Sequence, residues 1–304
     1  MPGVDTRVNI ATELIVRPLR PEDLEDVYQL YARSQQHDVG EIEVDREDLL
    51  TDWALPGMDM SRDTVGVFSG PDLVAAAELT LRHRAEVVIA PDARDRGIGT
   101  WLREWTERRA AEKGWELVAQ VVPDTNTAAR KLFLAAGYRT RHTSWVLRIE
   151  HDREPPEAQL PDRIAIRAYR PEDEHAVFRL FEDAFNEWPG RDPQPFEEWA
   201  AITTRRPDFR PDLFALAVDG DEIVGGAMSL AVSGEGWIDK IAVKATHRNR
   251  GIARALLQHA FREAWHRGER VSGLSTDSRT GALTLYEKVG MSVRRSYTSY
   301  AKDL

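Results

Sequence analysis

Arg94-Asp95-Arg96-Gly97-Ile98-Gly99 is the stretch that decides the fold, because the same frame returns as Arg248-Asn249-Arg250-Gly251-Ile252-Ala253. Two further pairs of matching segments lie in the same order in the two halves: 16–23 with 166–173, and 124–137 with 277–290. Each copy is long enough to hold a core of its own, unlike the units of a short solenoid repeat. The sequence therefore predicts one domain that has been duplicated.

The length and composition agree with two domains. The chain has 304 residues, with 41 Lys and Arg against 51 Asp and Glu and a formal net charge of −10. A domain usually has about 100–200 residues. We expect an N-terminal domain over 1–152 and a C-terminal domain over 164–304. Residues 153–163 between them are rich in proline and charge, which is typical of an exposed linker.

Several classes of protein are excluded or disfavoured by the composition. The chain has no cysteine, which excludes disulfides, Cys-ligated zinc and thiol nucleophiles. The histidines show no metal-ligand spacing, so we expect no metal site. No serine-hydrolase motif is present, which disfavours a serine hydrolase. The negative net charge argues against nucleic acid as a partner. Without a long apolar run or a leader sequence, we expect a cytoplasmic protein with no membrane partner.

Local patterns predict a mixed α/β fold of the α+β type in each half, built on a strand meander. The strands expected in the first half are 14–17, 64–68, 73–80, 87–90, 117–122 and 145–149, with helices over 21–34, 97–113 and 125–136. The strands expected in the second half are 214–218, 223–231, 237–243, 271–275 and 297–301, with helices over 251–267 and 280–289. This order differs from the strict strand–helix alternation of a doubly wound fold.

The glycine motif has the character of a phosphate-binding turn. A glycine-rich turn between a strand and a helix leaves backbone N–H groups free at the positive end of the helix dipole. A P-loop is excluded because Thr100 and Trp101 follow Gly99, and a dinucleotide fingerprint lacks its third small residue at Leu102. A tight turn without a ligand is the alternative interpretation.

The two motifs together resemble the GNAT superfamily of acyl-coenzyme A-dependent N-acetyltransferases. The matching residues are Ile89, Pro91, Arg94, Gly97, Gly99, Asn126, Ala129 and Gly137 in the first half, and Val243, Arg248, Gly251, Ala253, Ala282, Tyr286 and Gly290 in the second. The resemblance covers nearly the whole chain. It implies two tandem GNAT-like domains, each a twisted, mostly antiparallel splayed sheet flanked by helices, with acetyl-coenzyme A as the cofactor.

The resemblance also implies which residues hold the cofactor. In the second half they are Ile241, Ala242, Val243, Arg248, Arg250, Gly251, Ile252, Ala253, Arg254 and Ser278. In the first half they are Val88, Ile89, Arg94, Arg96, Gly97, Ile98, Gly99, Thr100 and Asn126. The strand residues would bind the pantetheine arm, and the loop residues would bind the pyrophosphate.

Catalytic residues are expected in the second half. In the resembled family, a tyrosine on the last helix often protonates the leaving thiolate, and a carboxylate on the strand before the loop often accepts the proton of the amine. Tyr286 and Asp239 stand at these positions, whereas the first half has Phe133 and Ala85, which can neither donate nor accept a proton. We expect a catalytic C-terminal domain and a degenerate N-terminal copy that can still bind coenzyme A. Packing alone for Tyr286 and a solvated position for Asp239 are the alternatives.

The expected reaction is transfer of an acetyl group from acetyl-coenzyme A to the primary amine of a small molecule. Because no cysteine can form an acetyl-enzyme, the amine should attack directly in a ternary complex. Acidic and aromatic residues over 182–199 would suit a cationic amine, although a solvated acidic helix face is equally consistent with them. A non-catalytic acyl-coenzyme A sensor or scaffold, a peptide or protein acetyltransferase, and a monomer or a homodimer stay open.

Overall fold

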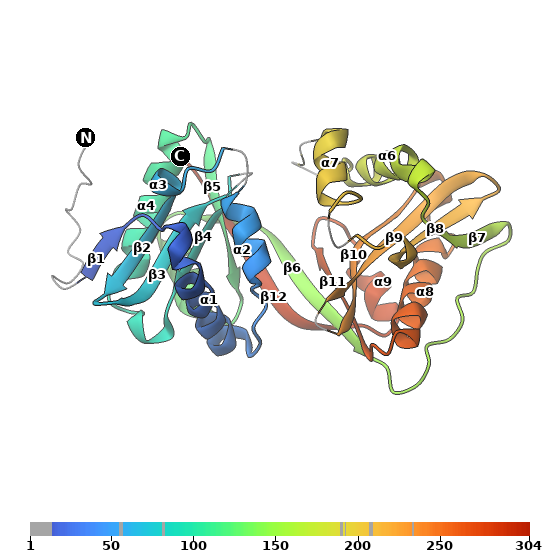
Figure 1. Cartoon of the computed structure of the whole chain (residues 1–304), viewed down its shortest axis with the longest axis horizontal. Coiled ribbons are helices and arrows are strands. Elements are labelled where there is room, and N and C mark those ends of the chain that lie inside the picture. Colours follow the sequence, from blue (N-terminus) through green and yellow to red (C-terminus); the bar gives the residue numbers. More distant parts are fainter. Residues whose placement is uncertain are drawn as a thin grey trace. The chain divides into compact units, whose positions relative to one another are not determined.

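The computed structural model describes residues 14–304 except 55–56, 81–82, 189–190, 192, 207–208 and 233. The chain forms two compact units, one made of the residues up to Thr143 together with Ser296–Leu304, the other of Ser144–Arg295 (Figure 1). In the described ranges, no helix is both long and apolar enough to cross a membrane.

The elements follow the same order in the two repeats, except that a 3-10 turn over Pro211–Leu213 replaces the short helix α3 in the second. The first repeat contains β1 (Leu14–Arg17), α1 (Leu24–Val39), α2 (Arg46–Trp53), α3 (Met60–Asp63), β2 (Thr64–Ser69), β3 (Asp72–Leu79), β4 (Ala85–Ile89), α4 (Ile98–Glu112), β5 (Leu117–Pro123), α5 (Thr127–Ala135) and β6 (Arg139–Glu150). The second contains β7 (Ile164–Ala168), α6 (Glu174–Phe185), α7 (Phe196–Ile202), β8 (Phe214–Asp219), β9 (Glu222–Val232), β10 (Glu235–Val243), α8 (Ile252–His266), β11 (Val271–Asp277), α9 (Leu283–Lys288) and β12 (Ser292–Asp303). The predicted mixed α/β class and tandem repeat are confirmed.

Each unit contains an antiparallel meander whose last strand diverges from the strand that follows it. In the first unit the order is β1-β2-β3-β4, and β4 approaches β5 through an isolated parallel bridge, Arg84 with Ala119. In the second unit the order is β7-β8-β9-β10. There β10 pairs with β11 in parallel from Gly236 to Ile238, and beyond Ile238 the two strands separate. The predicted splay is therefore present in both units.

The compact units do not coincide with the domain boundaries expected at 152 and 164, because the two repeats exchange their last strands. Residues 144–150 of β6 pair with β11 and belong to the second unit. Residues 297–303 of β12, at the end of the chain, pair with β5 in the first unit. The segment expected as a linker contains no helix or strand, and its Glu154 forms an ion pair with Arg262 and a hydrogen bond with His266 of α8.

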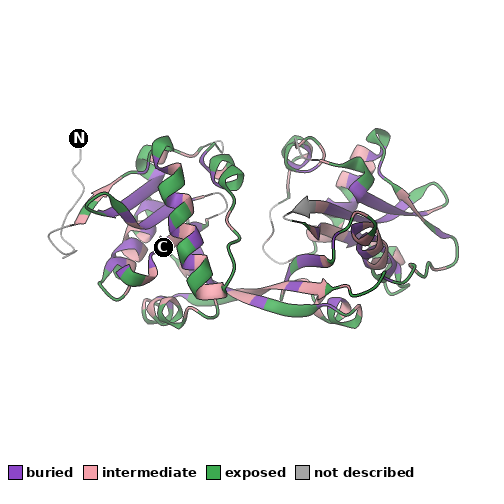
Figure 2. Ribbon diagram, turned by 60° about the horizontal axis from the view of Figure 1, so that its bottom comes forward, coloured by how far each residue is buried: buried purple, intermediate pink, exposed green. Residues whose placement is uncertain are grey.

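Helices cover both faces of each meander, as the buried strands and exposed outer helix faces of Figure 2 show. Neighbouring glycines of β9 make this explicit in the second unit, since adjacent strand residues face opposite ways. A Cβ at Gly225 would meet Ile252 and Leu256 of α8, whereas one at Gly226 would meet Phe181 of α6. The glycine motif begins α8, so this packing fixes where the loop lies relative to the sheet.

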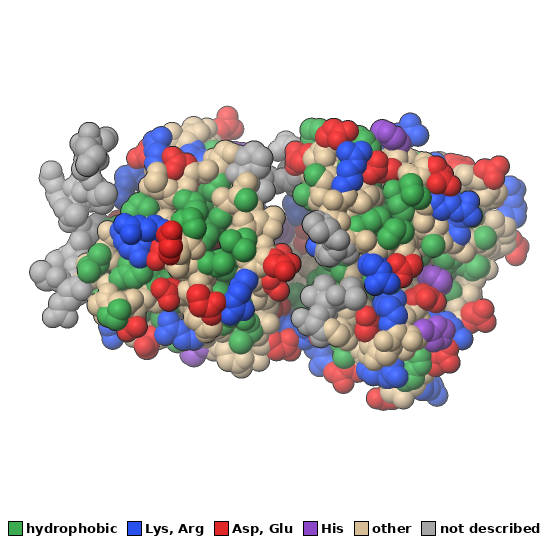
Figure 3. All heavy atoms as spheres, viewed as in Figure 1, with side chains coloured by type: hydrophobic (Ala, Val, Ile, Leu, Met, Phe, Trp, Pro, Cys, Tyr) green, Lys and Arg blue, Asp and Glu red, His purple; other side chains and the backbone are tan. Residues whose placement is uncertain are grey.

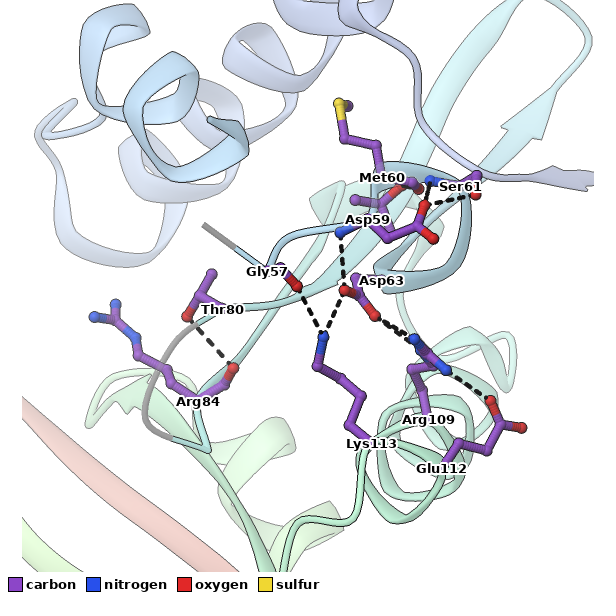
Figure 4. Close-up of polar contacts among 11 residues, drawn as sticks. Gly57, Asp59, Met60, Ser61, Asp63, Thr80, Arg84, Arg109, Glu112 and Lys113 are labelled. Atoms are coloured by element: carbon purple, nitrogen blue, oxygen red, sulfur yellow. Dashed lines mark hydrogen bonds and ion pairs between the residues drawn. The ribbon is translucent and has the colours of Figure 1, made fainter. Parts of the chain in front are cut away.

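A buried ionic cluster holds the first unit together where α3 meets α4 (Figure 4). Asp63 is fully buried and accepts hydrogen bonds from Arg109 Nε at 2.8 Å and Lys113 Nζ at 2.6 Å. It also accepts one from the backbone N–H of Asp59 at 3.0 Å. Burial opposes ionisation of Asp63, but these hydrogen bonds hold its pKa below the usual value. The cluster is a structural feature of the unit that carries no predicted catalytic residue.

Candidate functional site

The separation of β10 from β11 opens a cleft of about 750 Å³ in the second unit. Its wall is formed by β10 from Ile238 onward, by the loop before α8, by the end of β11 and by α9. The end of α6 lines it as well, over Ala184–Trp188 apart from Asn186. Most of the residues predicted for cofactor binding and catalysis in the second half therefore meet around one cleft.

The glycine loop enters α8 through a left-handed residue. Gly251, at the N-cap of α8, has φ +86°, a conformation that glycine adopts without the strain of a Cβ. Within the described part of the chain, no side chain caps this helix, so its first N–H groups lack a side-chain acceptor. Such a helix start suits a phosphate. Among the predicted cofactor residues of this half, the exposed Arg250 and Ser278 are outside the cleft wall.

The strand before the loop offers an open backbone edge to the cleft. Ile241, Ala242 and Val243 pair with β9 along one edge of β10 and line the cleft. The pairing with β11 ends at Ile238, so in the described residues the other edge carries no strand. An open edge can pair with an extended chain that carries amide groups, such as the pantetheine arm implied by the resemblance.

Tyr286 lies on α9 in the wall of the cleft and is 5% exposed. Burial raises the pKa of its phenol to about 12, against the smaller opposing effect of a hydrogen bond with the Thr276 side chain. The phenol is therefore protonated throughout the physiological range and can act as a hydrogen-bond donor. At the corresponding position of the first unit, Phe133 packs against the rings of Tyr138 and Tyr300, with centroids 4.8 Å and 5.9 Å away.

Asp239 lies in the cleft wall at an irregularity of β10 that the sequence did not reveal. Ile238 pairs with Ser229 and Lys240 with Met228, so Asp239 is the extra residue of a β-bulge. Its carboxylate forms an ion pair with Lys240. The β3–β4 ladder of the first unit is regular, and in its register the buried Ala85 corresponds to Ile238, so Asp239 has no counterpart there.

In the first unit, the predicted cofactor residues also gather at the start of a helix, α4, which Gly97 enters with φ +80°. Val88 and Ile98 are buried, whereas Arg96 and Thr100 are exposed. Arg94 and Asn126 already have partners in the protein. Both donate to Asp38, and Asn126 also caps α5 by accepting from Ala129 N–H.

The acidic residues of the second unit are largely engaged in ion pairs, which the sequence could not show. Among the described residues, three carboxylates line the cleft, and each pairs with a base that also lines it: Glu187 with Arg248, Asp239 with Lys240, and Asp277 with Arg279. Acidic and basic side chains are likewise interspersed on the face drawn in Figure 3. The expected preference for a cationic amine thus gains no support from an excess of negative charge in the wall.

Three residues of the site carry no recognisable signal in the sequence. Neighbouring strand residues usually face opposite ways, which argues against Lys240 lining the same cleft as Asp239. The bulge at Asp239 alters this alternation. Thr276 precedes the matched segment and carries no motif. Ser144 lines the cleft from the exchanged strand β6, and no local pattern indicates which repeat a final strand will join.

Comparison with known proteins agrees with this geometry. The model of the "Acetyltransferase (GNAT) family" matches residues 24–138 and 174–291. A mycothiol acetyltransferase of Streptomyces scabiei is 28% identical over 252 residues, which cover 77% of this chain and 76% of the relative. The crystal structure of a GCN5-related N-acetyltransferase from Sphaerobacter thermophilus is 33% identical, with a TM-score of 0.84 and coverage of 97% of this chain and 96% of that chain.

A tandem GNAT protein from the clavulanic acid biosynthesis pathway shares the fold, with a TM-score of 0.74 at 16% identity, over 96% of this chain and 98% of that one. These findings confirm the predicted enzyme class, an acyl-coenzyme A-dependent N-acetyltransferase with acetyl-coenzyme A as cofactor. Because the family model matches each repeat and more than half of the chain, the protein belongs to the acetyltransferase (GNAT) family.

Proposed function

We propose that the second unit transfers the acetyl group of acetyl-coenzyme A to the primary amine of a small molecule in the cytoplasm. The observation that carries this proposal is the cleft beyond Ile238, where the open edge of β10, the start of α8 and the protonated Tyr286 line one wall. The first unit has Phe133 in place of Tyr286, and its regular strand β4 has no counterpart of Asp239. The first unit therefore lacks the two side chains to which the proton transfers are assigned.

The residues of the cleft would divide the proton transfers between them. Alkyl amines are mostly protonated at neutral pH, like lysine with its pKa of about 10, and Asp239 accepts the proton directly or through water. Backbone N–H groups of β10 beyond Ile238 are donors for negative charge on the acyl oxygen. Acetyl-coenzyme A supplies the thioester: the C–N bond forms as the C–S bond breaks, and Tyr286 donates its proton to the departing sulfur.

The acceptor is proposed to be a small amine, and the acceptor of the mycothiol acetyltransferases is one candidate because those relatives cover most of this chain. Thiol release from acetyl-coenzyme A should be measured with that acceptor, a polyamine, an aminoglycoside, an amino acid and a short peptide. We expect turnover with at least one small amine and a kinetic pattern that requires both substrates to be bound. Turnover with none of them would favour a sensor or scaffold, and turnover with the peptide alone would favour a peptide acetyltransferase.

A further inference from the structure

In both units, a carboxylate near the end of the first long helix holds the first arginine of the glycine loop. Arg94 donates to both oxygens of Asp38, at 2.7 and 2.9 Å, and to the carbonyl oxygen of Ile89. Arg248 donates to both oxygens of Glu187, at 2.6 and 2.9 Å, and to the carbonyl oxygen of Val243. The same arginine of the motif is thus held in the same way in both repeats.

The two ion pairs differ in their exposure to water. The side chains of Arg94 and Asp38 are 18% and 8% exposed, whereas those of Arg248 and Glu187 are 39% and 49% exposed. The pair in the first unit also has additional partners. Asp38 accepts from Asn126 Nδ2 at 3.1 Å, and Arg94 donates to Ser34 Oγ at 2.9 Å.

This difference in exposure determines which of the two arginines can leave its carboxylate to bind a phosphate. Water screens an exposed ion pair, which therefore adds little free energy, and a phosphate offers an arginine strong, charge-assisted hydrogen bonds. Arg248 can leave Glu187 at small cost. Taking Arg94 from Asp38 would leave a largely buried carboxylate without its main counter-charge, which is far more costly.

We propose that Asp38 and Glu187 determine which loop accepts the phosphates of acetyl-coenzyme A. Arg248 exchanges Glu187 for the pyrophosphate, whereas Asp38 retains Arg94 and thereby prevents the first loop from binding phosphate. The inference rests on the proposed function of the second unit. It differs from the sequence-based expectation that the first repeat can still bind coenzyme A. On this proposal each chain binds one coenzyme A molecule, in the second unit.

Calorimetric titration with coenzyme A tests the exposed pair. The wild-type protein should bind one molecule per chain. Glu187→Gln removes the competitor of the phosphates at Arg248, so coenzyme A should bind roughly two- to fivefold more tightly. Glu197→Gln is the matched control, because Glu197 on α7 forms an exposed ion pair with Arg205 outside the cleft wall. Unchanged affinity in Glu187→Gln would overturn the exchange at Arg248.

The buried pair is tested by stoichiometry. Asp38→Asn should free Arg94 and raise the number of bound coenzyme A molecules from one to two. A folded variant that still binds one would contradict the role of Asp38 in the first loop.

Ala253→Asp provides a second test that leaves Asp38 intact, since it places a negative charge in the second loop and should abolish binding. Two sites in the wild type, or residual binding in Ala253→Asp, would also overturn the proposal. Failure of the proposed function can be distinguished from failure of this inference. If only the proposed function fails, turnover is absent but the changes in coenzyme A binding are still observed.

Discussion

At the scale of single residues, the proposed chemistry depends on a few atoms that distinguish two otherwise similar positions. Phe133 and Tyr286 are both buried on the last helix of their repeats, so a ring alone satisfies the packing there. Tyr286 differs from Phe133 by its hydroxyl group, and burial raises the pKa of this hydroxyl to about 12. The repeat provides an internal comparison in the sequence that separates packing from chemistry at this position, and the catalytic role of Tyr286 stays a prediction.

The raised pKa of Tyr286 predicts the alkaline side of the pH profile. Because the phenol titrates near 12, it remains protonated as the pH rises from about 7 to 10, and loss of its proton should not lower kcat in that range. The measurement is kcat at saturating acetyl-coenzyme A and amine over this range. A decline in kcat centred near the ordinary tyrosine pKa of about 10 would indicate a solvated phenol and contradict the assignment.

At the scale of elements, the bulge in β10 and the ionic cluster between α3 and α4 show what sequence patterns leave out. Counting back from Gly251 placed Asp239 on the strand, but a bulge depends on the pairing with β9 and leaves no local signature. Asp63 is far in the sequence from Arg109 and Lys113, so the cluster arises only when α3 packs on α4. Tertiary pairing, rather than local propensity, determines both features.

The ionic cluster predicts a large effect on the stability of the first unit. Asp63→Asn leaves Arg109 and Lys113 without their shared counter-charge and should lower the free energy of unfolding by about 3 kcal/mol. The folded state lowers the pKa of Asp63, so this stabilisation is complete above the unfolded pKa of about 4. It is lost as the pH falls through the folded pKa.

Urea unfolding at neutral pH measures this effect. The control is Asp212→Asn, which breaks the exposed ion pair with Arg210 and should change the free energy of unfolding by less than about 1 kcal/mol. Equal effects of the two substitutions would show that the cluster of Asp63 contributes no more than a surface ion pair.

At the scale of the whole molecule, the exchange of final strands makes each unit depend on both repeats. The duplication, the fold class and the loops could be predicted, since they rest on matching segments. The exchange could not, because β6 and β12 are both final strands of similar repeats, and either could pair with either partner. The boundary expected at 152 followed the proline-rich composition, which locates a loop but not the partner of the strand before it.

Removal of residues 296–304 tests the exchange. The deletion takes away the antiparallel partner of β5 and exposes Phe133, against which Tyr300 stacks. Amides of Leu117–Val122 in β5 should lose protection in hydrogen exchange, whereas those of Val271–Asp277 in β11 keep their partner strand β6 and their protection. Loss of protection in β11 with β5 unaffected would mean that each repeat retains its own final strand.

The central claim is that acetyl transfer takes place in the cleft of the second unit with Tyr286 as the proton donor. Its most direct test is kcat of Tyr286→Phe beside Tyr138→Phe, which removes a buried hydroxyl from the first unit. We predict a loss of roughly 100-fold or more in kcat for Tyr286→Phe, an unchanged Kd for coenzyme A, and wild-type kcat for Tyr138→Phe. Wild-type kcat in Tyr286→Phe would contradict the account.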